Sequence, residues 1–127
     1  MEIPEHPDPF RRLVAIVGVL RSEDGCPWDR EQDMASMIEH IREETEEVVE
    51  AVEAGDMDNL EEELGDVILQ AVFYARLAEE RDLFDVDSVL ERISEKLVSR
   101  HPHVFGDMEL NTAEEVLDQW EKIKAME

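Results

Sequence analysis

Hydrophobic side chains recur along this chain every three or four residues, which is the spacing of an amphipathic helix. The first such stretch contains Phe10, Leu13, Val14, Val17 and Leu20. Similar stretches follow, so that the pattern predicts five helices, over residues 10–20, about 34–54, 56–81, 87–100 and 112–123. No stretch of useful length alternates hydrophobic and polar residues as a strand does. The pattern therefore predicts an all-α protein.

Residues with known effects on helix ends mark the boundaries of these stretches. Gly55 stops the second helix, and one of the two aspartates that follow it is suited to cap the third. Pro102 ends the fourth helix, because a residue that precedes proline disfavours the helical conformation. Thr112 and Glu115 have the spacing of a capping box at the start of the last helix. The second and third helices are thus expected to form a central antiparallel hairpin.

The predicted helices are expected to pack as a bundle of about five helices in a single domain over residues 1–127, without internal repeats or a linker. The segment from Val67 to Tyr74 is apolar on more than one side, as expected for a central helix that touches several neighbours. A few short amphipathic helices make a thin core, and their full burial favours a second copy of the chain. We therefore expect a homodimer or a larger homo-oligomer.

The charge of the chain narrows the range of partners. Among its 127 residues 35 are acidic and 12 are lysine or arginine, which gives a formal net charge of -23. Nucleic-acid polymers and anionic membranes require a basic face, so neither is expected as a partner. A small anionic ligand is compatible with this charge if metal ions bridge it to acidic side chains. Most of the acids are expected simply to face the solvent.

Three features of the sequence favour a cytoplasmic location. Cys26 is the only cysteine, so no disulfide forms within the chain, which suits a reducing compartment. The segment from Met1 to Phe10 is acidic, carries three prolines and lacks the order of a secretory signal. The longest apolar run, from Leu13 to Leu20, is too short to span a bilayer.

Four acidic residues lie symmetrically about Gly55. Glu47 and Glu63 are each 8 residues from it, and Glu44 and Asp66 are each 11 residues from it. Residues three apart share a helix face, so a hairpin folded at Gly55 brings the four carboxylates together. They are expected at two levels, roughly 12 and 16 Å from the turn at about 1.5 Å per residue. Both pairs border the apolar stripes of their helices instead of opposing them.

Four converging carboxylates repel one another strongly unless cations lie between them. Oxygen ligands without sulfur favour hard cations such as Mg²⁺ or Mn²⁺. A redox-active di-iron centre is disfavoured, because no histidine of this chain has a carboxylate three residues before it. The alternative is that both acidic pairs are ordinary surface charges, since Glu-x-x-Glu is frequent by chance in so acidic a chain.

Five short motifs follow one another along the chain with a characteristic order and spacing. They are Gly25–Asp29 with Glu31 and Gln32, Glu43–Val48, Glu62–Asp66, Lys96 and Arg100 before His101–Gly106, and Trp120–Lys124. In these motifs the chain resembles the MazG-like nucleoside triphosphate pyrophosphohydrolases, from about Leu13 to Lys124. Asp33, Arg42 and Glu46 depart from residues that are common in that family, which leaves the base and sugar preference open.

The resemblance implies an all-α domain that assembles as dimers or dimers of dimers. It also implies Mg²⁺-dependent cleavage of a nucleoside triphosphate between the α- and β-phosphates, with Mn²⁺ as a possible substitute. The implied metal ligands are Glu44, Glu47, Glu63 and Asp66, the same four that the symmetry selects, and the first two also count as catalytic. Glu43 is the candidate for orienting or deprotonating the attacking water.

Candidate substrate contacts lie in the other motifs. Lys96 and Arg100 share a helix face and are expected to contact phosphates, the alternative being an exposed pair that bridges to local acids. Trp120 is suited to stack on a base or to fill the core, and Lys124 is a weaker phosphate candidate. Trp28 is a candidate because the family places its segment near the nucleotide, whereas by itself the segment indicates a rigid turn with a buried anchor.

The sequence is thus interpreted as that of an enzyme, a hydrolase of acid anhydrides that serves nucleotide-pool housecleaning. A hypothesis from another class is a catalytically silent acidic helical module that binds nucleotide or a partner. A third hypothesis narrows the enzyme to one deoxynucleotide, such as dUTP. The intact ligand positions favour the enzyme, because a silent relative is expected to have lost one of them.

Overall fold

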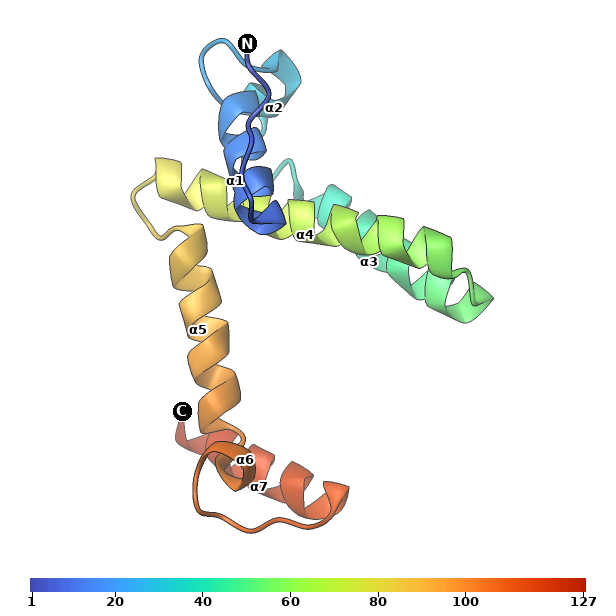
Figure 1. The fold of residues 1–127 in the computed structure, drawn as a ribbon, viewed down its shortest axis with the longest axis vertical. Helices are drawn as coiled ribbons and strands as arrows, with labels where there is room; N and C mark the ends of the chain where they lie inside the picture. Colours follow the sequence, from blue (N-terminus) through green and yellow to red (C-terminus); the bar gives the residue numbers. More distant parts are fainter. The chain divides into compact units, whose positions relative to one another are not determined.

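The structure is a computed structural model that describes residues 1–127, and it contains seven helices and no strand (Figure 1). The helices are α1 (Pro9–Leu20), α2 (Pro27–Glu31), α3 (Ile38–Ala54), α4 (Met57–Glu80), α5 (Val86–Ser99), α6 (Pro102–Phe105) and α7 (Ala113–Met126). The all-α prediction is confirmed, but the predicted number of about five helices omits α2 and α6. Both are single turns that begin with proline, too short to leave a helical period in the sequence.

The second predicted helix begins later than expected, at Ile38 instead of near Met34. The Asp33 carboxylate accepts a hydrogen bond from the Ser36 backbone N–H (2.8 Å), and the Ser36 hydroxyl accepts one from the Asp33 N–H (2.9 Å). These side chains satisfy backbone donors in a turn and so compete with the helix. Met34 and Met37 still pack in the core, which explains why the hydrophobic pattern extends beyond the helix.

The chain divides into two compact units, Met1–Val86 and Asp87–Glu127, which are described separately. In the first unit α3 and α4 pack against each other as the predicted antiparallel hairpin (Figure 1). Gly55 ends α3 in the left-handed conformation with φ of 66°, which glycine adopts without a steric penalty. The Asp56 carboxylate then caps α4 by accepting a hydrogen bond from the Asn59 N–H (3.2 Å).

The core of the first unit lies where α1 packs against α4. Its buried cluster consists of Val17, Met37, Val72, Phe73 and Leu77. The carboxyl-terminal half of α4 supplies three of these five side chains, which fits the prediction of a central, largely apolar helix. Burial of such side chains is the main favourable contribution to folding. No helix of the chain combines the length and the apolar character needed to cross a membrane.

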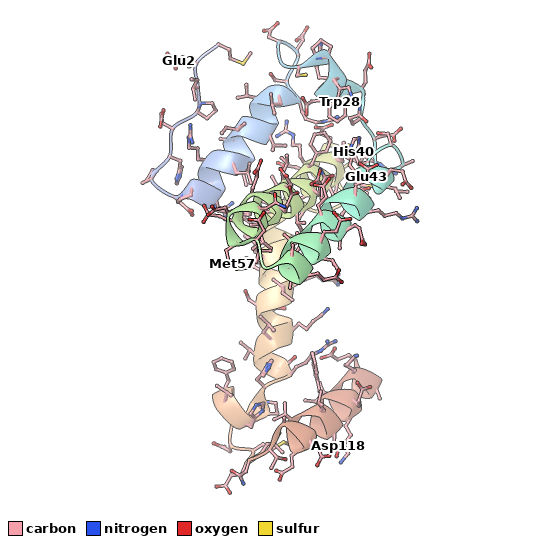
Figure 2. All side chains as sticks on the ribbon, turned by 90° about the vertical axis from the view of Figure 1, so that its right-hand side faces the viewer. Glu2, Trp28, His40, Glu43, Met57 and Asp118 are labelled. Atoms are coloured by element: carbon pink, nitrogen blue, oxygen red, sulfur yellow. The ribbon has the colours of Figure 1, made fainter.

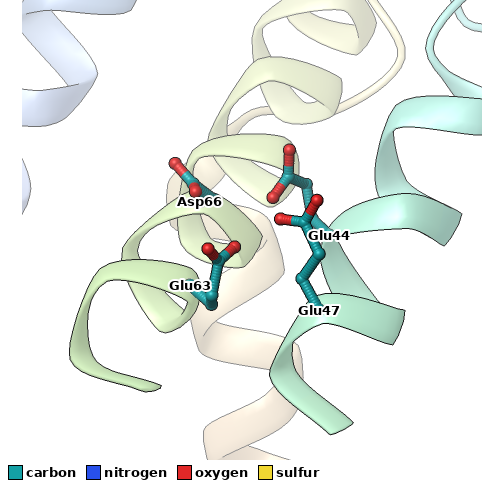
Figure 3. A group of neighbouring side chains, drawn as sticks. All are labelled: Glu44, Glu47, Glu63 and Asp66. Carbon is teal, nitrogen blue, oxygen red and sulfur yellow. The ribbon is translucent and has the colours of Figure 1, made fainter. Parts of the chain in front are cut away.

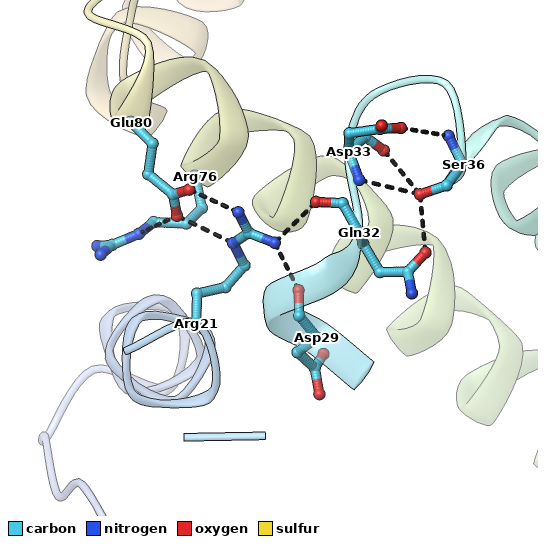
Figure 4. A network of polar contacts seen from close by, with 7 residues as sticks. All are labelled: Arg21, Asp29, Gln32, Asp33, Ser36, Arg76 and Glu80. Carbon is cyan, nitrogen blue, oxygen red and sulfur yellow. Dashed lines mark hydrogen bonds and ion pairs between the residues drawn. The ribbon is translucent and has the colours of Figure 1, made fainter. Parts of the chain in front are cut away.

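Arg21 holds the segment that connects α1 and α3 against this core (Figure 4). Its guanidinium donates hydrogen bonds to the backbone carbonyls of Asp29 and Gln32 and forms an ion pair with Glu80 (2.6 Å). The same group lies over the Phe73 ring, 5.6 Å from its centroid. One side chain thus fixes α2 and the residues after it against α1 and α4.

The second unit holds α6, α7 and all of α5 after its first residue. Thr112 caps α7 by accepting a hydrogen bond from the Glu115 N–H (3.2 Å), as the capping-box spacing predicts. The Glu115 carboxylate in turn accepts a hydrogen bond from the backbone N–H of Asn111 (3.1 Å). Arg100 closes this unit through an ion pair with Glu127 (2.6 Å).

Candidate metal centre

The acidic residues of the hairpin meet at one place. Glu44 and Glu47 lie on α3, Glu63 and Asp66 lie on α4, and one carboxylate oxygen from each lies within 4.8 Å of all the others (Figure 3). Each pair is spaced three residues apart, which puts both members on one helix face. The hairpin turns these two faces toward each other, as the symmetry about Gly55 predicts. We call this group of four side chains the carboxylate cage.

The cage lies at the edge of the packed surface between the two helices. Three of its members, Glu44, Glu63 and Asp66, are half-buried, whereas Glu47 is exposed. One oxygen of Glu44 and one of Glu63 are buried without any hydrogen-bond partner. A buried oxygen without a partner costs free energy, because it has lost its hydrogen bonds to water. A bound cation would satisfy both.

Hydrogen bonding, burial and the crowding of like charges raise the pKa of two carboxyl groups in the cage. A hydrogen bond with Glu47, burial and the neighbouring carboxylates together raise the pKa of Glu63 to about 7. Burial, and then the charges of Asp66 and Glu47, also raise the pKa of Glu44. No lysine or arginine forms an ion pair with any of the four. The negative charge therefore lacks a counter-charge from the chain, and an all-oxygen donor set of this kind fits a hard divalent cation.

The raised pKa of Glu63 predicts how pH acts on stability and on metal binding. Because its pKa is about 7 in the folded protein against 4.5 ordinarily, the folded cation-free protein binds more protons between these values than the unfolded chain does. Its stability should therefore fall as the pH rises through this interval. Bound Mg²⁺ should remove much of this loss of stability. The affinity of the protein for Mg²⁺ should rise with pH, because the cation displaces the proton of Glu63.

Thermal unfolding at pH 5 and pH 8, with and without Mg²⁺, measures this effect. The Glu63→Gln variant is the matched control, since it keeps the shape of the side chain but cannot ionise. A melting temperature that responds to pH and to Mg²⁺ equally in both proteins would contradict the assignment to Glu63.

Trp28, His40 and Glu43 lie near the end of the hairpin that is distant from Met57 (Figure 2). The Trp28 ring contacts the His40 ring edge-on, with centroids 5.5 Å apart, and remains 49% exposed. Trp28 is therefore not the buried anchor that its segment suggests by itself. Glu43 is exposed and lies outside the cage, although it is the neighbour of Glu44 in sequence.

The predicted phosphate contacts and Trp120 all belong to the second unit. Trp120 is half-buried there, with the Arg100 guanidinium 6.0 Å and the Lys124 ammonium 5.6 Å from its ring centroid. Arg100 forms an ion pair with an acid, as the alternative interpretation of the Lys96 and Arg100 pair expects. The acid is Glu127, which is distant in the sequence instead of local. Its hydrogen bond is the main reason that the pKa of Glu127 is lowered, and the exposed Lys96 contributes its charge to the same effect.

Several buried polar atoms of the second unit lack partners. They are Arg100 Nε, His103 Nδ1 and Trp120 Nε1. The structure thus gathers two predicted cations, Arg100 and Lys124, around one predicted aromatic contact. It brings these side chains together within the second unit, while the carboxylate cage and Trp28 belong to the first.

Two polar side chains of the hairpin are not among the site residues predicted from the sequence. Gln70 is buried within α4, and His40 packs against Trp28 at the start of α3. Their positions in the sequence could have indicated them. Each lies 15 residues from Gly55, so the two residues continue the symmetry of the acidic pairs by one helical turn. Because one is a histidine and the other a glutamine, they do not form a pair of like residues, and a pattern of carboxylates does not include them.

Comparison with known proteins yields a family and several relatives. The family model described as the MazG nucleotide pyrophosphohydrolase domain matches residues 32–105. A nucleoside triphosphate pyrophosphohydrolase from Escherichia coli strain K12 is 47% identical over 117 residues, which cover 91% of this chain and 44% of the relative. A nucleoside triphosphate pyrophosphohydrolase/pyrophosphatase MazG from Thermotoga maritima is 46% identical over 118 residues, covering 93% of this chain and 45% of the relative.

The fold also matches a solved structure. The crystal structure of a mazG-related protein from Thermotoga maritima superimposes with a TM-score of 0.74 at 35% sequence identity. The match covers 91% of this chain and 98% of that one. In contrast, the chain spans less than half the length of the two curated relatives.

Proposed function

The chain belongs to the MazG nucleotide pyrophosphohydrolase family, and we propose that it hydrolyses nucleoside triphosphates between the α- and β-phosphates, giving a nucleoside monophosphate and pyrophosphate. The observation that carries this proposal is the convergence of four carboxylates within 4.8 Å, with two buried oxygens that lack partners. Two curated relatives that are named for this activity support the choice of substrate class.

The proposed cofactor is Mg²⁺, with Mn²⁺ as a substitute, held by Glu44, Glu47, Glu63 and Asp66. When bound, it supplies Lewis acidity, lowers the pKa of bound water and stabilises charge on the departing pyrophosphate. The cage residues hold the cation from two helices that pack against each other, which limits their movement. Their negative charge alone would repel a triphosphate, so we propose that substrate binds only together with the cation.

Glu43 is proposed to orient or deprotonate the attacking water. It is exposed, follows His40 by three residues and is not one of the four residues of the cage. The Glu43→Gln variant should lose turnover by at least about a hundredfold, as is typical for a general base, and should keep its Mn²⁺ affinity. Glu47→Gln should lose both. Steady-state kinetics and Mn²⁺ titration separate these outcomes, and full turnover in Glu43→Gln would exclude the role.

The residues around Trp120 are proposed to contact the phosphates and the base of the substrate. Lys96, Arg100 and Lys124 carry positive charge in a chain with only 12 lysines and arginines. Cations of this kind bind phosphate oxygens, and the exposed tryptophan Trp28 and half-buried Trp120 offer rings on which a base can stack. Arg100 would exchange its bond to Glu127 for one to phosphate.

We also propose that the protein is a homodimer or a dimer of dimers. Each unit exposes apolar side chains that water contacts unfavourably: Val52, Leu64 and Ile68 on the hairpin, and Ile93 and Leu97 on α5. A second copy of the chain would cover such surfaces. Light scattering of the purified protein at micromolar concentration tests this, and a mass equal to one chain would exclude it.

One assay tests the reaction itself. The purified protein is incubated with canonical and damaged nucleoside triphosphates, with and without Mg²⁺, and both pyrophosphate and orthophosphate are measured. Pyrophosphate release that requires Mg²⁺ is the expected result. Orthophosphate alone would place hydrolysis at the γ-phosphate and contradict the proposal. Tight nucleotide binding without any release would favour the silent module instead. A cytoplasmic location and a housecleaning role stay predictions.

A further inference from the structure

Gln70 is the one buried polar side chain in the core of the chain, and one of its atoms has no partner. It is 6% exposed, and its Oε1 is buried without a hydrogen bond. It interrupts an otherwise apolar part of α4, in which its neighbours Val72 and Phe73 belong to the core cluster. A buried amide carbonyl without a partner is unfavourable, so the Gln70 Oε1 is available to accept a hydrogen bond from a group that the chain does not supply.

The position of Gln70 on α4 relates it to the carboxylate cage. It follows Asp66 by four residues and Glu63 by seven. At roughly 100° per residue, it lies about 40° around the helix from Asp66 and about 20° from Glu63, between the two. Gln70 therefore continues the acidic face of α4 by one turn, about 6 Å farther from the hairpin turn.

The direction of helical side chains then distinguishes Gln70 from His40, its counterpart at the same distance from Gly55. Side chains on a helix lean toward its amino terminus. His40 consequently leans away from Glu44, and the structure shows it against Trp28 instead. Gln70 leans the opposite way along the hairpin, because α4 runs antiparallel to α3, and helix geometry thus favours an amide directed back toward Asp66.

We propose that Gln70 is a positioning residue of the metal centre, whose Oε1 accepts a hydrogen bond from the hydration shell of the cation held by the carboxylate cage. This inference rests on the proposed function. The cage oxygens that would bind the cation direct lone pairs at it, so the protons of the water around the cation need acceptors elsewhere. A fixed neutral acceptor on the buried side selects one orientation. Mutation of residues that hydrogen-bond to the ligands of a metal commonly lowers metal affinity or activity by about 10–100-fold.

The experiment compares Gln70→Met with the unaltered protein. Methionine keeps the length and apolar bulk of the side chain but offers almost no hydrogen bond. Mn²⁺ serves as the probe, its affinity for the nucleotide-free protein being measured by electron paramagnetic resonance, and the cation-free melting temperature is recorded in parallel. We expect the variant to bind Mn²⁺ at least about tenfold more weakly, and to melt no lower without cation, because the unpartnered carbonyl is gone.

Two further variants sharpen the test. Gln70→Glu keeps an acceptor oxygen and should retain Mn²⁺ binding better than Gln70→Met. Gln119→Met changes the half-buried glutamine of the second unit in the same manner and should leave Mn²⁺ binding unchanged. Equal Mn²⁺ affinity in Gln70→Met and the unaltered protein would overturn the inference, as would a lower cation-free melting temperature with unchanged affinity, which indicates packing alone.

The outcome for Gln70 is distinguishable from that for the proposed function. If the unaltered protein releases pyrophosphate and binds Mn²⁺, while Gln70→Met binds it equally well, only the inference about Gln70 is wrong. If the unaltered protein neither binds Mn²⁺ nor releases pyrophosphate, both proposals are wrong.

Discussion

Replacing Glu63 by glutamine, or Asp66 by asparagine, is expected to lower pyrophosphate release on the order of a thousandfold, while raising the stability of the cation-free protein. Each change removes one of the proposed ligands, and its loss should misplace the cation and weaken the electrostatic effect of the cation on the reaction. The same change also removes one of four mutually repelling charges from within 4.8 Å. The two effects have opposite signs, as is common at functional sites whose residues oppose folding.

Turnover at saturating Mg²⁺ and chemical unfolding without cation measure these effects. Glu50→Gln on α3 and Glu61→Gln on α4 are matched controls, because both residues are exposed acids of the same hairpin outside the cage. They should change neither activity nor stability appreciably. Turnover that survives in Glu63→Gln and in Asp66→Asn would exclude the carboxylate cage as the metal centre.

Replacing Arg21 by alanine is expected to be the most destabilising change, by about 2–4 kcal/mol. The side chain is only 9% exposed, and its loss leaves the carbonyls of Asp29 and Gln32 without their donor. It also removes a cation from the face of the Phe73 ring. Glu80 is 32% exposed, so water compensates part of the lost ion pair, and the carbonyls account for most of the expected effect.

Urea unfolding compares this variant with Arg76→Ala. Arg76 also pairs with Glu80 (3.1 Å), but its side chain is 36% exposed. Its replacement should cost roughly 0.5 kcal/mol or less, as is usual for a surface pair. If both variants lose the same stability, the ion pair with Glu80 is what matters and the role assigned to the carbonyl contacts is wrong.

The hairpin and its carboxylate cage follow from local sequence alone. Gly55 sets the turn, and the spacing of Glu44 and Glu47 about it matches that of Glu63 and Asp66. Helical geometry converts this spacing into a shared face on each helix, and the packing of α3 against α4 about the turn brings the two faces together. For the same reason the cap at Thr112 was predictable, because it involves residues only three apart.

Other features depend on contacts between residues far apart in the sequence. Arg21 meets Glu80 across 59 residues, and the Tyr74 hydroxyl donates to the Met34 carbonyl (2.9 Å) across 40. The sequence does not indicate either contact, since arginines and tyrosines are frequent on helix surfaces. The start of α3 was misplaced because the bonds between Asp33 and Ser36 replace a helical turn, while Met34 and Met37 keep a helix-like spacing for the core.

The sequence by itself determined which acids share a helix face, where the hairpin turns and to which family the chain is similar, because these depend on spacing. Only the tertiary structure decided which polar atoms are buried and unpartnered, among them the Gln70 carbonyl and one oxygen each of Glu44 and Glu63. Burial arises from everything that packs around an atom, and spacing along one helix does not contain that information. A hydrogen bond with Glu47, burial and the neighbouring carboxylates raise the pKa of Glu63 to about 7, although glutamates elsewhere in the chain share its chemistry.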